Sequence, residues 1–355
     1  GQKLSFGELD RLARCWAQHL IERAIQPGDR VACHLSTSLE MMVVLLGNYH
    51  AGAIHVPINT RYGHSEIDHI LTDSGAKLLV SSGEAALESI LDQSEISREL
   101  ERVSVTEAFE TLSSLQPLAD SRIRADEDIA LLIYTSGTTG KSKGVELSFR
   151  AVVSNIDALT QLWQFSKDDC LVLALPLFHV HGLCIGVHGT LLRGNRSRLH
   201  RRFVPENVAA EFQSGATVFM GVPTMYAKLV EHLESHPDAA AGMHPARLFT
   251  SGSAALSKSI FQRFENLTGH RILERYGMSE TLLTLSNPYD GERRAGTVGM
   301  EVEGSDVRVF GEEFTETDVG VVGEIHVRGS SLFSGYWRQP EQTEAAFHDD
   351  WFRTG

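Results

Sequence analysis

The chain is organised around one segment rich in glycine and hydroxyl groups, which reads Tyr134-Thr135-Ser136-Gly137-Thr138-Thr139-Gly140-Lys141-Ser142-Lys143-Gly144. An apolar strand is predicted immediately before this segment, over residues 129–134, and a helix is predicted to begin near Ser148. The glycines allow the backbone to turn its N–H groups toward an anion, while the hydroxyls and the two lysines add donors and positive charge. The sequence therefore predicts a loop that binds a polyphosphate.

The closest alternative is the phosphate loop of nucleoside triphosphatases, whose pattern is G-x-x-x-x-G-K-[ST]. Gly140-Lys141-Ser142 satisfies the end of that pattern, but the first glycine would fall on Thr135, so the match fails. A plain surface loop is the other alternative. Surface loops rarely concentrate so many donors between a buried strand and a helix, which favours the binding role.

Strands and helices alternate on both sides of the segment and predict a parallel α/β fold. Near the N-terminus, Ser5 and Glu8 form a capping box for the first helix. The elements predicted before the segment are strands over 30–35, 54–57 and 77–81, helices over 38–50 and 64–72, and a mainly helical connection over 84–127. The strands predicted after it cover 170–175, 217–220, 247–250 and 271–273.

The sequence changes character after about residue 300, where alternating strands are predicted around 307–310 and 323–327. The glycines and acidic residues between these strands are typical of turns. We therefore predict an α/β protein with two lobes, each with a mainly parallel sheet, over residues 1–300. A small β-barrel-like subdomain is predicted over residues 301–355.

The composition excludes several classes of protein. Hydrophobic residues make up 42% and charged residues 22% of the 355 residues, which is typical of a soluble globular protein, and no apolar run reaches the roughly 18 residues of a membrane span. The net charge of −14 argues against non-specific binding to nucleic acid or an anionic membrane. The four cysteines form no CxxC pair, so we expect a reducing compartment and neither a zinc site nor a redox pair.

Several motifs in order give the sequence a close resemblance to the adenylate-forming superfamily, which includes acyl-CoA synthetases, luciferases and peptide-synthetase adenylation domains. The glycine-rich segment is the first of them. The others are Leu175-Pro176-Leu177-Phe178-His179-Val180-His181-Gly182, Gly221-Val222-Pro223-Thr224, Ser251-Gly252-Ser253-Ala254-Ala255, Glu274-Arg275-Tyr276-Gly277-Met278-Ser279-Glu280-Thr281, Gly320–Gly329, Gly335-Tyr336-Trp337 and Trp351-Phe352-Arg353-Thr354-Gly355. The resemblance covers essentially the whole chain and implies the luciferase-like large domain, with the ATP and acyl sites in the two α/β lobes.

The resemblance also implies individual roles. The residues implied to hold the β- and γ-phosphates of ATP are Thr135, Ser136, Gly137, Thr138, Thr139 and Lys143. Those implied to surround the adenine are Gly252, Ser253, Ala254, Tyr276, Gly277 and Met278. Glu280 would bind Mg²⁺ together with Thr135, and Ser279, where the superfamily usually has threonine, would contact the α-phosphate. Attack of a carboxylate on a phosphate brings anions together, so such cations and donors are needed independently of the resemblance.

Three of the aromatic side chains in these motifs have alternative readings. Tyr276, which the resemblance stacks on the base, has core packing as an alternative. The resemblance places His179 beside the acyl pocket as a catalytic residue. On a strand, His179 and His181 would share one face, but two histidines without a carboxylate make a poor metal site. A purely structural role stays open for His181.

The segment after Glu280 bears on the identity of the acid. It most resembles the malonyl-CoA synthetase branch, in which an arginine here pairs with the second carboxylate of malonate. Arg293 or Arg294 would have this role, with Arg294 slightly preferred because it directly precedes the Ala-Gly-Thr-Val-Gly turn, and Ser286 would also contact the acid. A guanidinium holds a carboxylate bidentately, whereas a fatty-acid pocket would not favour a buried arginine. The alternative is that both arginines are solvated beside Asp290 and Glu292.

The expected activity is that of an AMP-forming acid–CoA ligase that uses ATP, Mg²⁺ and coenzyme A to convert malonate, or methylmalonate, to its CoA thioester. The alternatives are a ligase for a fatty or aromatic acid, an adenylation domain that loads a carrier protein, and a non-catalytic nucleotide-binding module. The resemblance implies that the C-terminal catalytic domain is absent from this chain, so we expect the fragment alone to be weakly active or inactive. We expect a cytoplasmic protein, or a mitochondrial one in a eukaryote, with no nucleic-acid partner.

Overall fold

The computed structural model describes residues 2–123, 125–135 and 141–355, so the predicted phosphate contacts Ser136, Gly137, Thr138 and Thr139 lie outside the described residues. The chain divides into two compact units. Unit 1 comprises residues 1–149 and 333–339, and unit 2 comprises residues 150–332 and 340–355. The expected boundary near residue 300 would separate the two α/β lobes from a small β subdomain, and it stays a prediction.

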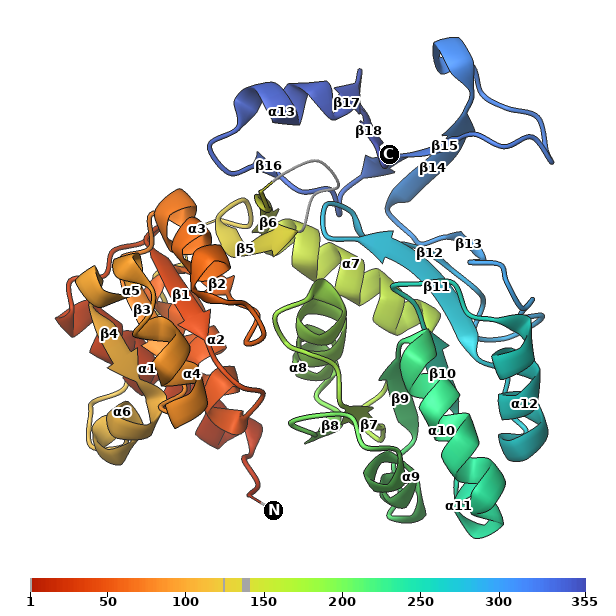
Figure 1. Ribbon diagram of the computed structural model, residues 1–355, viewed down its shortest axis with the longest axis horizontal. Coiled ribbons are helices and arrows are strands. Elements are labelled where there is room, and N and C mark those ends of the chain that lie inside the picture. The colour runs from red at the N-terminus through yellow and green to blue at the C-terminus, as the bar shows by residue number, and fades with distance from the viewer. Residues whose placement is uncertain (1, 124, 136–140) are drawn as a thin grey trace. The chain divides into compact units, whose positions relative to one another are not determined.

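Unit 1 is built on a seven-stranded sheet (Figure 1). Its strands lie in the order β16 (Gly335–Tyr336), β6 (Lys143–Ser148), β5 (Ile129–Thr135), β2 (Ile54–Pro57), β1 (Arg30–His34), β3 (Leu78–Ser81) and β4 (Arg102–Ser104). Strands β1 to β5 pair in parallel, whereas β6 and β16 join antiparallel at one edge. The helices of this unit are α1 (Phe6–Glu22), α2 (Leu39–Ala51), α3 (His64–Ser74), α4 (Ala85–Leu91), α5 (Glu95–Glu99) and α6 (Val105–Leu112).

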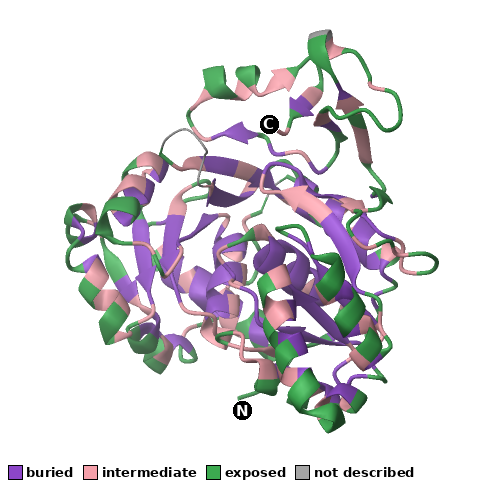
Figure 2. Cartoon of the chain, turned by 45° about the vertical axis from the view of Figure 1, so that its right-hand side comes forward, coloured by how far each residue is buried: buried purple, intermediate pink, exposed green. Residues whose placement is uncertain are grey.

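The local sequence explains why these elements form. Strands β2 and β3 are buried at every residue, as expected for parallel strands covered on both faces, and they appear purple in Figure 2. Helix α1 begins with the predicted capping box between Ser5 and Glu8, which is confirmed. It packs closely on α2 at Gly47, where a Cβ would overlap the Trp16 ring and come within 2.7 Å of the Ala13 carbonyl oxygen.

Unit 2 contains a second seven-stranded sheet. Its strands lie in the order β13 (Met300–Glu301), β12 (Leu282–Ser286), β11 (Leu273–Met278), β10 (Leu248–Ser251), β9 (Val218–Gly221), β7 (Cys170–Leu173) and β8 (Arg196–Leu199). Strands β7 to β11 are parallel, and β12 and β13 add an antiparallel edge. The helices are α7 (Phe149–Leu162), the π-helix His181–His188, α8 (Gly189–Arg193), α9 (Pro205–Gln213), α10 (Pro223–Ser235), α11 (Pro237–Gly242) and α12 (Lys258–Thr268).

The C-terminal part of unit 2 forms an antiparallel sheet. Its strands lie in the order β14 (Ser305–Phe310), β15 (Glu324–Gly329), β18 (Trp351–Arg353) and β17 (Phe347–His348). A short 3₁₀ turn (Glu312–Phe314) and α13 (Pro340–Ala345) connect these strands. The predicted antiparallel strands are confirmed, but the sheet has two edges, β14 and β17, in the described chain and does not close into the expected barrel-like form.

The fold class predicted from the sequence is confirmed, although the sequence analysis missed several strands, among them β4, β6 and β12. A strand, β6, precedes the helix expected near Ser148, which begins at Phe149. Its Val145 and Leu147 alternate with Glu146, a two-residue period that the neighbouring phosphate motif obscured. Strand β4 lies in the connection read as mainly helical, and β11 continues to Met278 and turns back as β12. None of the helices in the described chain is long and apolar enough to cross a membrane.

Candidate active site

In unit 1, strands β5 and β6 position the two described residues of the predicted phosphate site. Thr135, the last residue of β5, lies opposite Lys143, the first residue of β6. The Lys143 ammonium lies 4.3 Å from the centre of the Tyr336 ring, a cation–π contact that limits its freedom. Gly144 follows for a packing reason, because a Cβ there would come within 3.2 Å of the Trp337 Cβ. A hydroxyl and an ammonium are therefore held side by side at the end of this hairpin.

In unit 2, the β11–β12 hairpin carries the motif predicted to bind the nucleotide. The register of the hairpin shifts between Tyr276 and Gly277, and a Cβ at Gly277 would overlap the Leu282 carbonyl oxygen. Leu282 itself has a left-handed backbone, with φ at 56°. This bulge ends the regular ladder just before the turn, where Glu280 is buried. The half-buried residues here are Tyr276, Gly277, Met278 and Ser279.

The second predicted adenine motif follows the neighbouring strand β10. Ser251, the last residue of β10, pairs with Glu274 of β11, so the carboxyl ends of these two parallel strands are adjacent. Gly252 has no room for a side chain, because a Cβ would overlap the guanidinium of Arg275, and Ser253 adopts a left-handed backbone with φ at 68°. Ser253 and the following Ala254 are exposed. Open α/β sheets bind ligands at this edge, and the adenine-binding role of these residues stays a prediction.

Arg275 is a buried cation without an acidic partner among the described residues. Its side chain is only 5% exposed, and its Nε and Nη2 atoms have no hydrogen-bond acceptor in the described chain. Burial lowers the pKa of Arg275 to about 9, and no carboxylate opposes that effect. An unpaired buried charge makes folding less favourable by several kcal/mol. The sequence motif contains this arginine, but its burial and missing partner are visible only in the structure.

His181 adds a second buried group with unused hydrogen-bonding capacity. It begins the π-helix, its side chain is buried, and neither ring nitrogen has a partner in the described chain. Burial first, and then the charges of Arg275 and His179, lower the pKa of His181, so the ring is neutral at physiological pH. Short π-helical turns are frequent at functional sites. A neutral imidazole and a guanidinium therefore lie near each other in the interior of unit 2.

His179 and His181 do not lie on a strand, so the shared face that a strand would give them does not arise. Strand β7 ends at Leu173, and His179 lies in the irregular segment before the π-helix. His179 is exposed and contacts the Phe178 ring at 4.6 Å between centroids, although nearby protein atoms desolvate it enough to lower its pKa. Across residues 2–123, 125–135 and 141–355, no three His, Cys, Asp or Glu side chains gather as metal ligands.

The two arginines expected to bind the acid differ in their surroundings. Arg293 is half-buried and donates hydrogen bonds to the carbonyl oxygens of Pro288, Arg271 and Tyr289, at 3.1, 2.7 and 2.6 Å. These bonds hold the loop after β12 in place. Arg294 pairs with Glu292 at 3.0 Å, and its side chain is 71% exposed.

Ser286, also expected to contact the acid, is buried at the end of β12. Its hydroxyl accepts a hydrogen bond from the Trp163 indole at 3.0 Å and donates one to the Asn287 carbonyl at 2.9 Å. Arg275 is its partner across the hairpin. The serine therefore has protein partners already, whereas two nitrogens of the adjacent arginine have no acceptor among the described residues.

The fold and these groups at the carboxyl edge of a parallel sheet are those of a nucleotide-binding α/β protein. The model of one protein family, described as AMP-binding enzyme, matches residues 1–337. The chain belongs to this AMP-binding enzyme family. The superfamily predicted from the sequence motifs is thereby confirmed.

Particular relatives are more specific. A malonate–CoA ligase from Arabidopsis thaliana is 33% identical over 351 residues, which cover 92% of this chain and 57% of that protein. The crystal structure of ATP-bound MatB from Rhodopseudomonas palustris is 36% identical, with a TM-score of 0.92 over 100% of this chain and 71% of that one. A malonyl-CoA ligase in a ternary product complex with methylmalonyl-CoA and AMP is 40% identical, with a TM-score of 0.88 over 100% and 72%. The chain spans less than two thirds of the length of the A. thaliana relative.

Proposed function

We propose that this chain provides the nucleotide- and acid-binding part of an ATP-dependent, AMP-forming acid–CoA ligase whose acid is malonate or methylmalonate. Its membership of the AMP-binding enzyme family and its likeness to proteins named malonate–CoA ligase support the reaction class. The observation that carries the choice of a dicarboxylate is the buried guanidinium of Arg275, which has two nitrogens without an acceptor in the described part of the chain.

The proposed reaction has two steps. A carboxylate oxygen of the acid attacks the α-phosphorus of ATP, a C–O–P linkage forms, and the bond to the β-phosphate breaks so that pyrophosphate leaves. The sulfur of coenzyme A then attacks the acyl carbon and loses its proton, the thioester forms, and AMP leaves. Both steps bring together or move negative charge, which oriented N–H groups, cations and Mg²⁺ stabilise.

The proposed nucleotide contacts are those predicted from the motifs. Thr135 and Lys143 bind the terminal phosphates, and Tyr276 stacks on the adenine. Glu280 fits a role as Mg²⁺ ligand, because its buried carboxylate is a hard oxygen donor at the turn of the β11–β12 hairpin. Bound magnesium supplies positive charge to the phosphates. Ser279, one residue earlier, contacts the α-phosphate, and His179 contacts the acid.

Arg275 is the proposed partner of the carboxylate that does not react. A fatty acid would leave this buried charge unpaired, whereas a second carboxylate would accept two parallel hydrogen bonds from the guanidinium. His181, which is neutral and close by, offers a further donor to the same group. Arg293 and Arg294 stay as alternatives, but the first already has three carbonyl partners and the second is solvent-exposed. Methylmalonate differs from malonate by one methyl group, worth only about 1–3 kcal/mol in a pocket.

A panel of acids tests this proposal. Pyrophosphate exchange by the full-length protein is measured with malonate, methylmalonate, butyrate, a long-chain fatty acid and benzoate, and malonate is expected to give the highest kcat/KM. In Arg275→Met, kcat/KM for malonate should fall at least about 30-fold, because truncating one partner of a buried charge pair costs about 2–5 kcal/mol. The value for butyrate should change by no more than about threefold, since butyrate has no second charge to lose.

Matched arginine variants separate the candidates. Arg293→Met and Arg294→Met are measured with the same two acids, and a selective loss with malonate in either one, with Arg275→Met unaffected, would transfer the role to that residue. Preference for a fatty acid or benzoate would make the protein a ligase of another acid. Exchange without coenzyme A turnover would indicate carrier-protein loading, and no exchange with any acid would indicate a nucleotide-binding module.

The four buried, unpaired cysteines support a reducing compartment, the cytoplasm or the mitochondrial matrix.

A further inference from the structure

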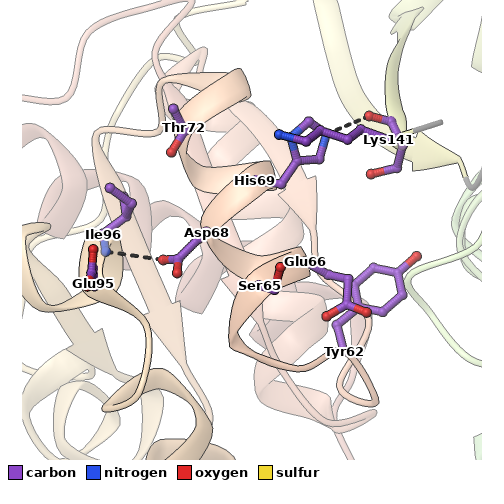
Figure 3. A pocket seen from close by; sticks show the side chains of 10 residues that line it. Tyr62, Ser65, Glu66, Asp68, His69, Thr72, Glu95, Ile96 and Lys141 are labelled. Carbon is purple, nitrogen blue, oxygen red and sulfur yellow. Dashed lines mark hydrogen bonds between the residues drawn. The ribbon is translucent and has the colours of Figure 1, made fainter.

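Helix α3 forms hydrogen bonds on both sides of the hairpin end that carries Thr135 and Lys143, with a backbone carbonyl on one side and a side-chain hydroxyl on the other. The His69 ring nitrogen Nε2 lies 2.7 Å from the carbonyl oxygen of Ser142, the residue before β6, as the dashed line from His69 in Figure 3 shows. One helical turn later, the Asp73 carboxylate accepts a hydrogen bond of 2.6 Å from the Tyr134 hydroxyl. Residues four apart lie on the same face of a helix, so one surface of α3 holds both strands.

The chemistry of each contact is fixed by its acceptor. A carbonyl oxygen can only accept, so His69 must carry its proton on Nε2 and donate it to Ser142. The His69 ring also packs edge-on against Tyr134, with centroids 6.2 Å apart and planes at 85°. Burial first, and the nearby Asp73 second, raise the pKa of Tyr134, so its hydroxyl stays protonated as the donor to Asp73.

A cavity lies beside the contact between His69 and Ser142. Its volume is about 620 Å³, and Tyr62, Ser65, Thr72, Lys141 and Ser142 are among the residues that line it. Figure 3 labels the first four of these. Among the hydrogen bonds of the described residues, the one from His69 ties the Ser142 carbonyl oxygen to α3, so removing this donor should loosen the start of β6. On the Tyr134 side, the helix end is tied further by the Trp337 indole, which donates to the Asp73 carbonyl oxygen at 3.1 Å.

These contacts fall on the neighbours of the proposed phosphate ligands. Tyr134 precedes Thr135, and Ser142 precedes Lys143. Thr135 and Lys143 lie opposite each other across the hairpin. We propose that His69 and Asp73 are positioning residues that set the separation and direction of Thr135 and Lys143 for ATP. This inference rests on the proposed function only for the identity of the bound ligand. A displacement of about 1 Å in a binding group can lower a rate by about 100-fold, so such anchoring matters.

The test compares two substitutions at one position with a control on the same helix. His69→Gln keeps an N–H donor near the place of Nε2, His69→Phe keeps a ring without the donor, and Thr72→Ala removes another side chain that lines the same cavity. In the full-length protein, His69→Phe should raise the KM for ATP about tenfold, the equivalent of one net hydrogen bond. The KM for the acid should stay within about twofold, and His69→Gln and Thr72→Ala should behave like the wild type.

A second readout does not depend on catalysis. Without nucleotide, hydrogen–deuterium exchange of the peptide that covers 141–148 should be faster in His69→Phe than in wild type, His69→Gln or Thr72→Ala. The difference should persist from pH 6 to 8, because Nε2 donates in both the neutral and the charged ring. Tyr134→Phe, which keeps the ring and removes only the bond to Asp73, provides an independent variant if His69→Phe does not fold, and it should also raise the KM for ATP.

The outcomes separate the two proposals. An unchanged KM for ATP together with unchanged exchange of residues 141–148 in His69→Phe and Tyr134→Phe would overturn the positioning role while the ligase function stands. Equal losses in His69→Gln and His69→Phe would also overturn it, because they would show that the donor is not what matters. If the wild-type protein shows no pyrophosphate exchange with any of the acids, the ligase function is overturned. The deuterium measurement would still decide whether α3 anchors the hairpin.

Discussion

Unit 2 contains two arginines removed from solvent to different degrees, and their partners differ completely. Arg247 donates to both carboxylate oxygens of Asp169, at 2.6 and 2.7 Å, and to the Trp163 carbonyl oxygen at 2.8 Å. It also lies over the ring of Tyr289 at 5.2 Å. Arg275 has no carboxylate near it in the described chain and keeps two nitrogens without acceptors.

The difference separates a structural charge from one that is suited to a ligand. Burial lowers the pKa of Arg247, but its hydrogen bonds to Asp169 and Tyr289 outweigh that effect, and the pKa is raised overall. For Arg275 burial dominates, and the pKa is lowered. A fully partnered arginine stabilises the free protein, whereas an arginine without partners makes the free protein less stable and becomes favourable when an anion binds. The experiments below are arranged to test that contrast.

The largest effect is expected when the ion pair between Arg247 and Asp169 is broken. Asp169→Ala removes the carboxylate partner of the half-buried Arg247, so the free energy of unfolding should fall by about 3–5 kcal/mol. Urea denaturation followed by circular dichroism measures the change. The double variant Asp169→Ala/Arg247→Met, which removes both charges, should recover part of the loss, and a double variant less stable than the single one would contradict the role given to Asp169.

A smaller effect is expected when a ligand binds to Arg275. At about 100 times its dissociation constant, malonate should raise the free energy of unfolding of the full-length protein by about 2.7 kcal/mol in the presence of AMP. Arg275→Met should lose this stabilisation. Without malonate, the free energy of unfolding of the variant should equal or exceed that of the wild type, because the substitution removes a buried charge. An Arg275→Met variant that is destabilised without ligand and still stabilised by malonate would show that the arginine is structural.

The smallest effect is expected at the exposed arginine. Arg294→Ala breaks only the surface pair with Glu292, so the free energy of unfolding should change by less than about 1 kcal/mol. Thermal denaturation at low and high salt measures it, and Glu292→Gln is the matched control for the same pair. A larger loss in Arg294→Ala than in Glu292→Gln would show that Arg294 has a partner other than Glu292.

The sequence was sufficient wherever function and local pattern coincide. The capping box at Ser5 and the buried parallel strands depend on neighbours in the chain, and the structure confirms them. Strand β6 was missed because its alternation of Val145 and Leu147 is only six residues long and lies beside a stronger signal. The bulged β11–β12 hairpin was missed because a register shift depends on pairing, which no single strand reveals.

The choice of arginine shows a different limit. Arg293 and Arg294 attracted attention because they are adjacent charges in a loop, and a sequence does display charge. What distinguishes Arg275 is the absence of an acceptor within reach in the described residues, which is a property of tertiary packing. His69 was overlooked for a similar reason, because its partner is a backbone carbonyl 73 residues further along the chain.

Strand β16 has a consequence for the order in which the protein is made. The sheet of unit 1 receives its last strand from Gly335–Tyr336, while its other six strands are complete by Ser148. At ribosomal speeds of roughly 5–20 residues per second, β6 waits on the order of ten to forty seconds before its partner is synthesised. During that interval its unpaired edge is open to other nascent chains, so aggregation during synthesis should respond to changes along β6 that leave the finished protein unaffected.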